Sequence, residues 1–168
     1  GAFDEGNKEL GAYFEPLKQA LSEAEYADAK ASVLNAYYTD IEIVKTVWSL
    51  VEKAGFNGGR IIDPSGGTGN FIGAMPNEIR AKSHISIVEP DRISYKIAQA
   101  LYDDDNISIF NCGIEKAPFR SGEFDLAISN IPFGDYRVND PRFNNLKLNI
   151  HDYFFAKALD LVKEGGLV

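Results

Sequence analysis

Short apolar runs alternate with helical patterns along most of this chain, and that alternation limits the folds it can adopt. We expect strands at Arg60–Asp63, Ile85–Glu89, Ile107–Asn111 and Phe124–Ser129. Helices are expected at about Gly69–Ala74, after Asp91 as N-cap, and over Tyr153–Val162. Strands that alternate with helices form a doubly wound parallel α/β sheet, whose ligand site lies in the loops at the carboxyl ends of the strands. The sequence therefore predicts the chemistry at Asp63–Gly69, Glu89, Asn111–Glu115 and Asn130–Phe133.

The chain before this alternation is helical. Two helices are expected between residues 8 and 36, where Ser22 and Glu25 form a capping box. Thr39 and Glu42 repeat that signature, which predicts that a third helix begins at Thr39. These patterns indicate helices that precede the sheet.

We therefore divide the chain into an N-terminal helical segment, 1–35, and one α/β domain, 36–168. The chain starts at Gly1 without an initiator methionine and stops at Val168, just after Gly165-Gly166, where a fifth strand begins. We expect the domain to be incomplete at its C-terminus, and this part alone to show little of the whole protein's activity.

Composition excludes several classes of protein. The net charge of −8 argues against a basic face that runs over the whole chain and binds nucleic acid. One cysteine, Cys112, and two histidines offer no cluster at metal-ligand spacing, and no apolar run is long enough to span a membrane. We expect a cytoplasmic protein without a metal or a membrane partner.

A glycine-rich segment, Asp63–Phe71, lies between an expected strand and an expected helix. Closely spaced glycines allow a ligand to approach the backbone, and a helix N-terminus offers free N–H groups, so a nucleotide-like ligand is indicated. The dinucleotide fingerprint would need a glycine where Ile72 stands, and the Lys-Ser/Thr pair of a P-loop is absent. A purely structural turn is the remaining alternative.

Two further features follow other strands. Glu89 stands 22 residues after Gly67, where a carboxylate can accept both hydroxyl groups of a ribose, although a surface Glu before Pro90 is also common. Asn130-Ile131-Pro132-Phe133 offers an amide oxygen, a backbone carbonyl and an aromatic ring, which suit a planar substrate with an amino group. As a tetrapeptide alone it is equally consistent with an ordinary turn.

Together these motifs resemble those of class I S-adenosylmethionine-dependent methyltransferases, specifically the enzymes that methylate the N6 amino group of adenine in DNA. Asp63–Phe71 resembles their Asp-Pro-x-x-Gly-x-Gly-x-Phe cofactor loop, and Asn130–Phe133 resembles their Asn-Pro-Pro-Tyr/Phe catalytic motif. Ala36-Tyr37-Tyr38-Thr39 is similar to the aromatic-Thr motif that packs over the methionine part of the cofactor. A weaker similarity, at 151–154 and Gly165-Gly166, is to methylase domains of methylase–helicase fusion proteins of phages and conjugative elements.

The resemblance implies a Rossmann-like fold, S-adenosyl-L-methionine as cofactor, and DNA as partner in restriction-modification, with target recognition largely beyond Val168. The implied catalytic residues are Asn130, Ile131, Pro132 and Phe133; the implied cofactor-binding residues are Tyr38, Thr39, Asp63, Pro64, Ser65, Gly67, Gly69, Phe71, Glu89, Pro90, Cys112 and Gly113. Ile131 departs from the family, which has proline there. Cytosine N4, a guanine in RNA or a protein glutamine are alternative substrates, and a cofactor-binding module without catalysis is an alternative role.

The remaining expectations concern packing and charge. Core positions are expected for four apolar residues, Trp48, Phe154, Phe155 and Leu159, while Ile93, Ile97 and Leu101 share one helix face. His151 is expected at a helix start and His84 in a loop. The loop after the catalytic motif concentrates polar and basic side chains, Arg137, Asn139, Arg142 and Lys147, and an ordinary solvated loop explains them equally well.

Overall fold

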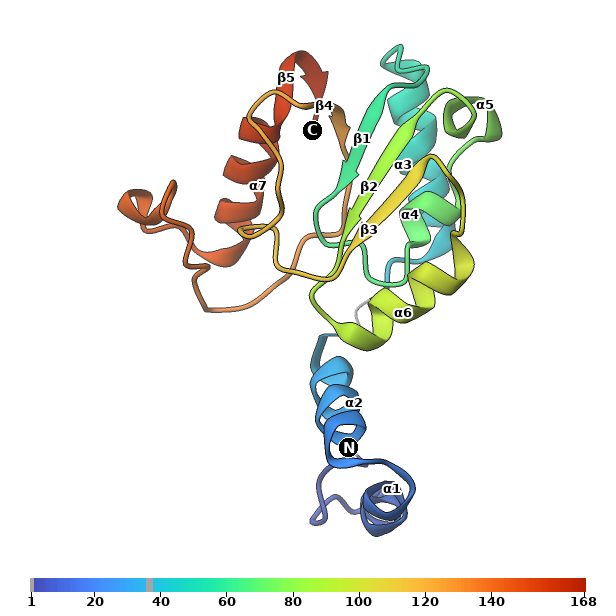
Figure 1. Cartoon of the computed structure of the whole chain (residues 1–168), viewed down its shortest axis with the longest axis vertical. Coiled ribbons are helices and arrows are strands. Elements are labelled where there is room, and N and C mark those ends of the chain that lie inside the picture. Colours follow the sequence, from blue (N-terminus) through green and yellow to red (C-terminus); the bar gives the residue numbers. More distant parts are fainter. Residues whose placement is uncertain (1, 36–37) are drawn as a thin grey trace.

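The computed structural model describes residues 2–35 and 38–168, and its centre is a parallel sheet of five strands (Figure 1). The strands are β1 (Arg60–Asp63), β2 (His84–Val88), β3 (Ile107–Phe110), β4 (Phe124–Ala127) and β5 (Val162–Leu167), in the order β3-β2-β1-β4-β5. The helices are α1 (Phe14–Ala20), α2 (Glu23–Asn35), α3 (Ile41–Lys53), α4 (Asn70–Gly73), α5 (Asn77–Arg80), α6 (Arg92–Leu101) and α7 (Ile150–Leu161). The expected doubly wound α/β fold is confirmed.

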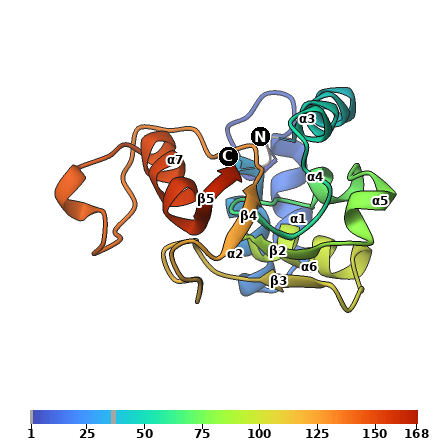
Figure 2. The ribbon, with the colours of Figure 1, turned by 90° about the horizontal axis from the view of Figure 1, so that it is seen from above.

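Helices cover both faces of the sheet, and the side-chain alternation of β1 separates two cores. Ile61 and Ile62 are both fully buried, and they point to opposite faces because successive residues of a strand do so. Ile61 packs with residues of α3, α4 and α5, whereas Ile62 packs with residues of α7. Figure 2 shows α3 and α7 on opposite sides of the strands. Each fully buried isoleucine contributes roughly 1.5–3 kcal/mol of hydrophobic stabilisation.

The N-cap of the helix α3 lies one residue later than its sequence signature predicts. Asp40, and not Thr39, is the N-cap, because the Asp40 side chain accepts a hydrogen bond from the N–H of Glu42 at 2.8 Å. Trp48 is buried as expected, and its Nε1 donates to the backbone oxygen of Phe71 at 2.7 Å. This bond fixes α3 against the last residue of the glycine-rich segment.

Two of the expected core residues on α7 are exposed. Phe154 is buried, but Phe155 and Leu159 are 57% and 66% exposed. The helix turns its Phe154–Leu161 stripe toward the sheet, and residues next to that stripe rotate away from it because one layer covers only one helix face. His151 does lie at the helix start, whereas His84 is the first residue of β2 and not part of a loop.

The helix α6 shows the same discrepancy between apolar pattern and burial. Asp91 caps it as expected, accepting a hydrogen bond from the N–H of Ser94 at 2.7 Å. Ser94 and Ala98 are buried, while Ile97 and Leu101 are 41% and 62% exposed. Small side chains therefore form the face that contacts the sheet, since they let the helix approach it closely.

The N-terminal helices stand apart from the sheet, beyond one end of α6 (Figure 1). Ser22 and Glu25 form the predicted capping box, in which the N–H of Ser22 donates to Glu25 at 3.0 Å. An ion pair of 3.3 Å joins Asp28 of α2 to Arg92 of α6. Residues 2–33 include no fully buried side chain, so this segment adds little to the core. No helix within 2–35 and 38–168 is long and apolar enough to cross a membrane.

A buried ion pair attaches the long loop that follows β4 to α7. Lys157 Nζ lies 2.9 Å from Asp140 Oδ2, and the two side chains are 7% and 3% exposed. The hydroxyl of Tyr153 donates to the same oxygen at 2.8 Å, and the N–H of Arg142 donates to Oδ1 at 3.0 Å. Burial raises the pKa of Asp140, but hydrogen bonds from Lys157, Arg142 and Tyr153 outweigh it and leave that pKa below its ordinary value.

We expect Lys157→Met to lower the free energy of unfolding by about 3–5 kcal/mol, because it leaves the Asp140 carboxylate buried without a cation. Urea denaturation measures the change. The double variant Asp140→Asn/Lys157→Met should recover most of the loss, since no buried charge remains. Equal stability of Lys157→Met and the parent chain would show that the pair does not hold the loop.

Candidate active site

The glycine-rich segment forms a tight turn between β1 and α4. The N–H of Gly66 donates to the backbone oxygen of Val88 at 3.0 Å, and the N–H of Gly69 donates to that of Gly66 at 2.8 Å. A Cβ on Gly66 would lie 2.3 Å from Ile87 Cγ2, so only glycine lets the turn approach β2. Gly69 has a φ of 86°, a conformation that favours glycine.

Tyr102 supports this turn from the end of α6. Its hydroxyl donates to the backbone oxygen of Gly69 at 2.8 Å. A Cβ on Gly69 would lie 2.3 Å from the Tyr102 ring, and a Cβ on Gly73 would lie 2.6 Å from the Tyr102 hydroxyl. Sequence analysis missed Tyr102 because its role depends on how α6 packs against the turn, although Gly73 was a signal of close contact.

Glu89 follows β2 and bridges two loops. Oε2 accepts a hydrogen bond from the N–H of Gly67 at 2.7 Å, and Oε1 accepts one from the N–H of Asp91 at 2.7 Å. Burial, which leaves 7% of the residue exposed, raises the pKa of Glu89, while the two N–H groups oppose that rise. The predicted acidic residue therefore lies directly against the glycine-rich turn.

Asp63 lies at the end of β1 and is 1% exposed. Oδ1 accepts hydrogen bonds from the Ser129 hydroxyl at 2.6 Å and from the N–H of Ser65 at 3.3 Å. Oδ2 is buried and has no hydrogen-bond partner among the residues that the structure describes. Burial raises the pKa of Asp63 to about 7, although the bonds from Ser129 and Ser65 oppose the rise.

The four residues of the predicted catalytic motif follow β4, next to the turn. The Ser65 hydroxyl donates to the backbone oxygen of Asn130 at 2.8 Å, which joins the turn to the motif. Asn130, Ile131 and Pro132 are half-buried, whereas Phe133 is 68% exposed. The structure thus brings together Asp63, Ser65 and Asn130 at the carboxyl ends of adjacent strands.

The aromatic-Thr motif is only partly described, because Ala36 and Tyr37 lie outside the described residues. The backbone oxygen of Thr39 accepts a hydrogen bond from Asn70 Nδ2 at 3.2 Å. The Tyr38 ring, half exposed, lies 3.8 Å from the position of a Cβ on Gly67. These contacts bring the end of the motif over the glycine-rich turn.

The remaining predicted cofactor residues differ in their surroundings. Pro64 and Phe71 are buried, and Phe71 packs into the hydrophobic core rather than the crevice. Pro90 is exposed, and Cys112 is half-buried. Burial, followed by the nearby Glu115 carboxylate, raises the pKa of the Cys112 thiol, which makes it a poor nucleophile.

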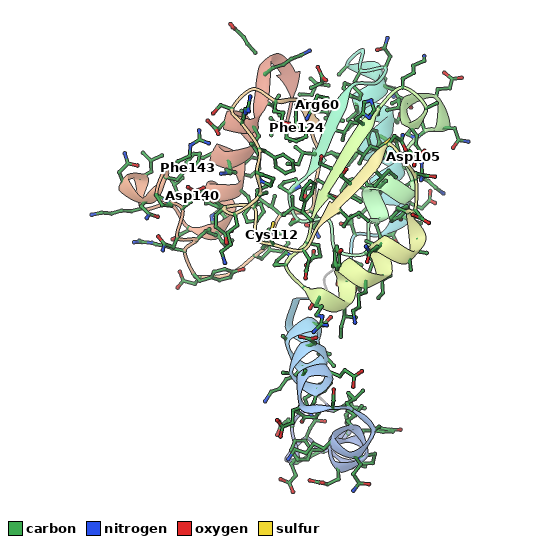
Figure 3. The ribbon with its side chains drawn as sticks, in the orientation of Figure 1. Arg60, Asp105, Cys112, Phe124, Asp140 and Phe143 are labelled. Atoms are coloured by element: carbon green, nitrogen blue, oxygen red, sulfur yellow. The ribbon has the colours of Figure 1, made fainter. Side chains whose placement is uncertain are left out.

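Asn111 links the loops that follow β2 and β3. Its Nδ2 donates to the backbone oxygens of Glu89 at 2.9 Å and of Pro90 at 3.2 Å. Gly113 is half-buried in the same region, where a Cβ would lie 2.3 Å from the Glu115 carboxylate. The sequence predicted a ligand site in this loop but no role for Asn111, because the hydrogen-bond partners of Asn111 lie in the loop after the neighbouring strand. Figure 3 shows Cys112 at the end of the sheet where these loops meet.

Among the residues that the structure describes, no group of three or more His, Cys, Asp or Glu side chains could hold a metal ion. The site therefore consists of a glycine-rich turn, two buried carboxyl groups and the Asn-Ile-Pro-Phe motif. The turn follows β1 and the motif follows β4, where the chain order of the strands reverses, and this is the usual ligand crevice of an open parallel sheet. Glu89 follows β2, the other neighbour of β1.

Comparison with known proteins agrees with this architecture. No protein-family model matches the sequence. Over 137 residues the chain is 27% identical to "Defense against restriction protein B" of Escherichia phage P1, a match that covers 80% of this chain and 6% of the phage protein.

Two solved structures are similar in fold. One, from Methanococcus maripaludis, is named as an S-adenosyl-L-methionine-dependent methyltransferase; it has a TM-score of 0.56 and 18% identity, with 85% of this chain and 59% of that one covered. The other, from Vibrio vulnificus, is named as a modification subunit of a type I restriction enzyme; it has a TM-score of 0.55 and 17% identity, with 89% and 34% covered. The fold is that of Rossmann-like methyltransferases. The chain spans less than two thirds of either solved protein.

We expect the ionisation of Asp63 to make the stability of the fold depend on pH. Its pKa is about 7 in the folded chain and about 3.8 as a free side chain, so the folded state holds a proton that the unfolded state releases. Between pH 4 and pH 7 stability should fall as pH rises, by at most about 1.4 kcal/mol per unit, and above pH 7 this contribution is constant.

Denaturation curves at several pH values measure this dependence. Asp63→Asn should flatten the slope between pH 4 and pH 7, because asparagine does not titrate there. An unchanged slope in Asp63→Asn would assign the pH dependence to another group.

Proposed function

We propose that this chain binds S-adenosyl-L-methionine in the crevice between β1 and β4 and transfers its methyl group to the N6 amino group of adenine in DNA. The observation that carries the proposal is the 2.8 Å hydrogen bond from Ser65 to the backbone oxygen of Asn130. It joins the glycine-rich turn, suited to a nucleotide-like cofactor, to a motif suited to a planar substrate with an amino group.

The residues around the turn fit the cofactor. Each oxygen of Glu89 accepts one backbone N–H, which leaves a lone pair on each oxygen for a ribose hydroxyl. Asp63 Oδ2 is buried without a partner within the described part of the chain, and it is available to a polar group of the methionine moiety. The half-exposed ring of Tyr38 lies beside Gly67 and would cover the bound molecule.

Methyl transfer requires accurate positioning. The bound cofactor supplies a methyl group on a sulfonium, which is open to in-line attack. The side-chain oxygen of Asn130 and the carbonyl of Ile131 would accept the two amino hydrogens and direct the nitrogen lone pair at that methyl group. Phe133, 68% exposed, would stack on a base that has been flipped out of the duplex.

DNA adenine is favoured over other amino or amide substrates by the Asn-Ile-Pro-Phe motif and by the names of two similar proteins, a phage protein that acts against restriction and a type I modification subunit.

Methyl-labelled cofactor should label unmethylated DNA incubated with the intact protein, and nucleoside analysis should find N6-methyladenine. Label in cytosine, RNA guanine or a protein glutamine would identify another substrate. Cofactor binding without any transfer would identify a non-catalytic module, which Ile131 in place of proline permits.

We expect Glu89→Ala to weaken cofactor binding by about 1–3 kcal/mol, because it removes a charge-assisted hydrogen-bonding group. Calorimetry measures the affinity. Glu78→Ala, which removes an exposed carboxylate on α5, is the matched control and should bind normally. Unchanged affinity in Glu89→Ala would remove Glu89 from the cofactor site.

Asn130→Ala should lose most methyl transfer while it retains cofactor binding, because Asn130 contacts the substrate in this proposal. Phe133→Ala should weaken binding of the base by about 1–3 kcal/mol, the usual contribution of one stacked base. Transfer rates and cofactor titrations on the intact protein separate the two effects. Normal turnover by Asn130→Ala would contradict its role.

A further inference from the structure

A cavity lies in the loop between the catalytic motif and α7. Its volume is about 220 Å³, below the roughly 300–1,000 Å³ typical of small-molecule pockets, so it suits a group such as phosphate better than a whole nucleotide. Charged, amide and apolar side chains line it: Arg137, Val138, Asn139, Phe143, Asn144, Lys147, Leu148 and Tyr153. Two of the lining residues are cations.

These two cations are unpaired, unlike others nearby. Arg142 pairs with Asp160 at 2.8 Å, and Lys157 pairs with Asp140. Over the described ranges, the side chains of Arg137 and Lys147 make no hydrogen bond or ion pair, and both residues are exposed. The cavity therefore carries positive charge that the protein does not neutralise, in a chain whose net charge is −8.

Lys147 also has an unfavourable backbone conformation. Its φ is 53° and its ψ is 35°, and it is the only residue other than glycine with a positive φ in 2–35 and 38–168. Glycine or asparagine adopts this left-handed conformation more readily than lysine. Such an outlier often marks a functional position. A lysine here is disfavoured by the backbone alone, which points to a use for its charge.

The walls of the cavity are held in place before any ligand binds. Asn144 Nδ2 donates to Asn139 Oδ1 at 2.8 Å, and Asn144 Oδ1 accepts from the N–H of Asp140 at 3.0 Å. The Tyr153 hydroxyl and Lys157 both bind the Asp140 carboxylate. Figure 3 shows Asp140 and Phe143 beside α7, on the side of that helix away from the strands.

The cavity lies close to the proposed base-binding residue. Arg137 follows Phe133 by four residues, so their Cα atoms are at most about 14 Å apart, the length of four extended residues. A nucleic-acid strand rises about 3.4 Å per nucleotide, so a strand whose base stacks on Phe133 reaches the cavity within a few nucleotides.

We propose that Arg137 and Lys147 clamp a backbone phosphate of a nucleic-acid substrate in this cavity. The inference rests on the proposed function, because it takes the methylated base to belong to a polynucleotide. The clamp reads no base sequence; it would set the position of the strand relative to Phe133.

Binding of a fluorescently labelled, adenine-containing single-stranded oligonucleotide to the purified chain tests the clamp, by polarisation at a series of salt concentrations. Lys147→Asn removes the charge and leaves a residue that accepts the left-handed conformation, and Arg137→Gln removes the second charge. Each variant should bind more weakly, and the double variant should reduce the slope of log affinity against log salt by about 0.7, the value for one phosphate contact on a single strand. Thermal unfolding should show both variants folded.

The matched control is Lys82→Asn, an exposed lysine before β2, at the opposite end of the sheet. It should leave both the affinity and the salt slope unchanged. The clamp would be overturned if Lys82→Asn lost as much oligonucleotide affinity as Lys147→Asn. It would also be overturned if the parent chain bound no oligonucleotide, including the case in which it bound inorganic phosphate alone. Calorimetry with the cofactor alone is a separate readout: cofactor binding without oligonucleotide binding defeats only the clamp, whereas failure to bind cofactor defeats the proposed function.

Discussion

The parallel pairing of β1 with β4 is the constraint on which the site depends. In the sheet, Ile62 pairs with Ala127, and the N–H of Ile128 donates to the backbone oxygen of Ile62 at 3.0 Å. Asp63 is the next residue after Ile62, and Ser129 is the second residue after Ala127, so their side chains come within hydrogen-bond distance. Strand order reverses at this pair, so the following loops diverge and leave a crevice. The glycine-rich turn and the catalytic motif meet because the backbone ladder aligns their strands.

The two acidic groups beside the crevice differ in how far hydrogen bonds compensate for their burial. Both oxygens of Glu89 accept a backbone N–H, whereas Asp63 has all its hydrogen bonds on Oδ1 and leaves Oδ2 buried alone among the described residues. Desolvation raises both pKa values, and it raises that of Asp63 to about 7. An ionised Asp63 is thus destabilising without a partner, which favours either a proton on that carboxyl group or a polar ligand beside it.

Sequence patterns predicted the parts of this protein that depend on neighbouring residues in the chain. The existence and order of the strands and the caps at Ser22 and Asp91 are local features, and the structure agrees with them. Strand ends were predicted less well: β4 ends at Ala127 and not Ser129, and β5 begins at Val162, before Gly165-Gly166. Burial of Phe155 and Leu159 was predicted wrongly, because apolar character does not tell which helix face a single layer will cover. Tyr102 was missed for a related reason, since its contact with Gly69 exists only after α6 docks beside the turn.

Charge pairing restricts where a polyanion can contact this surface. The chain has 17 lysine and arginine residues against 25 acidic ones, and several of the arginines already face carboxylates, including Arg60 with Glu123, Arg80 with Asp104 and Arg142 with Asp160. Long-range attraction of a nucleic acid is therefore weak, and binding depends on local contacts. Under the proposed function, stacking on Phe133 and hydrogen bonds at Asn130 would select the base. The electrostatic field of the surrounding surface would contribute little to holding the strand.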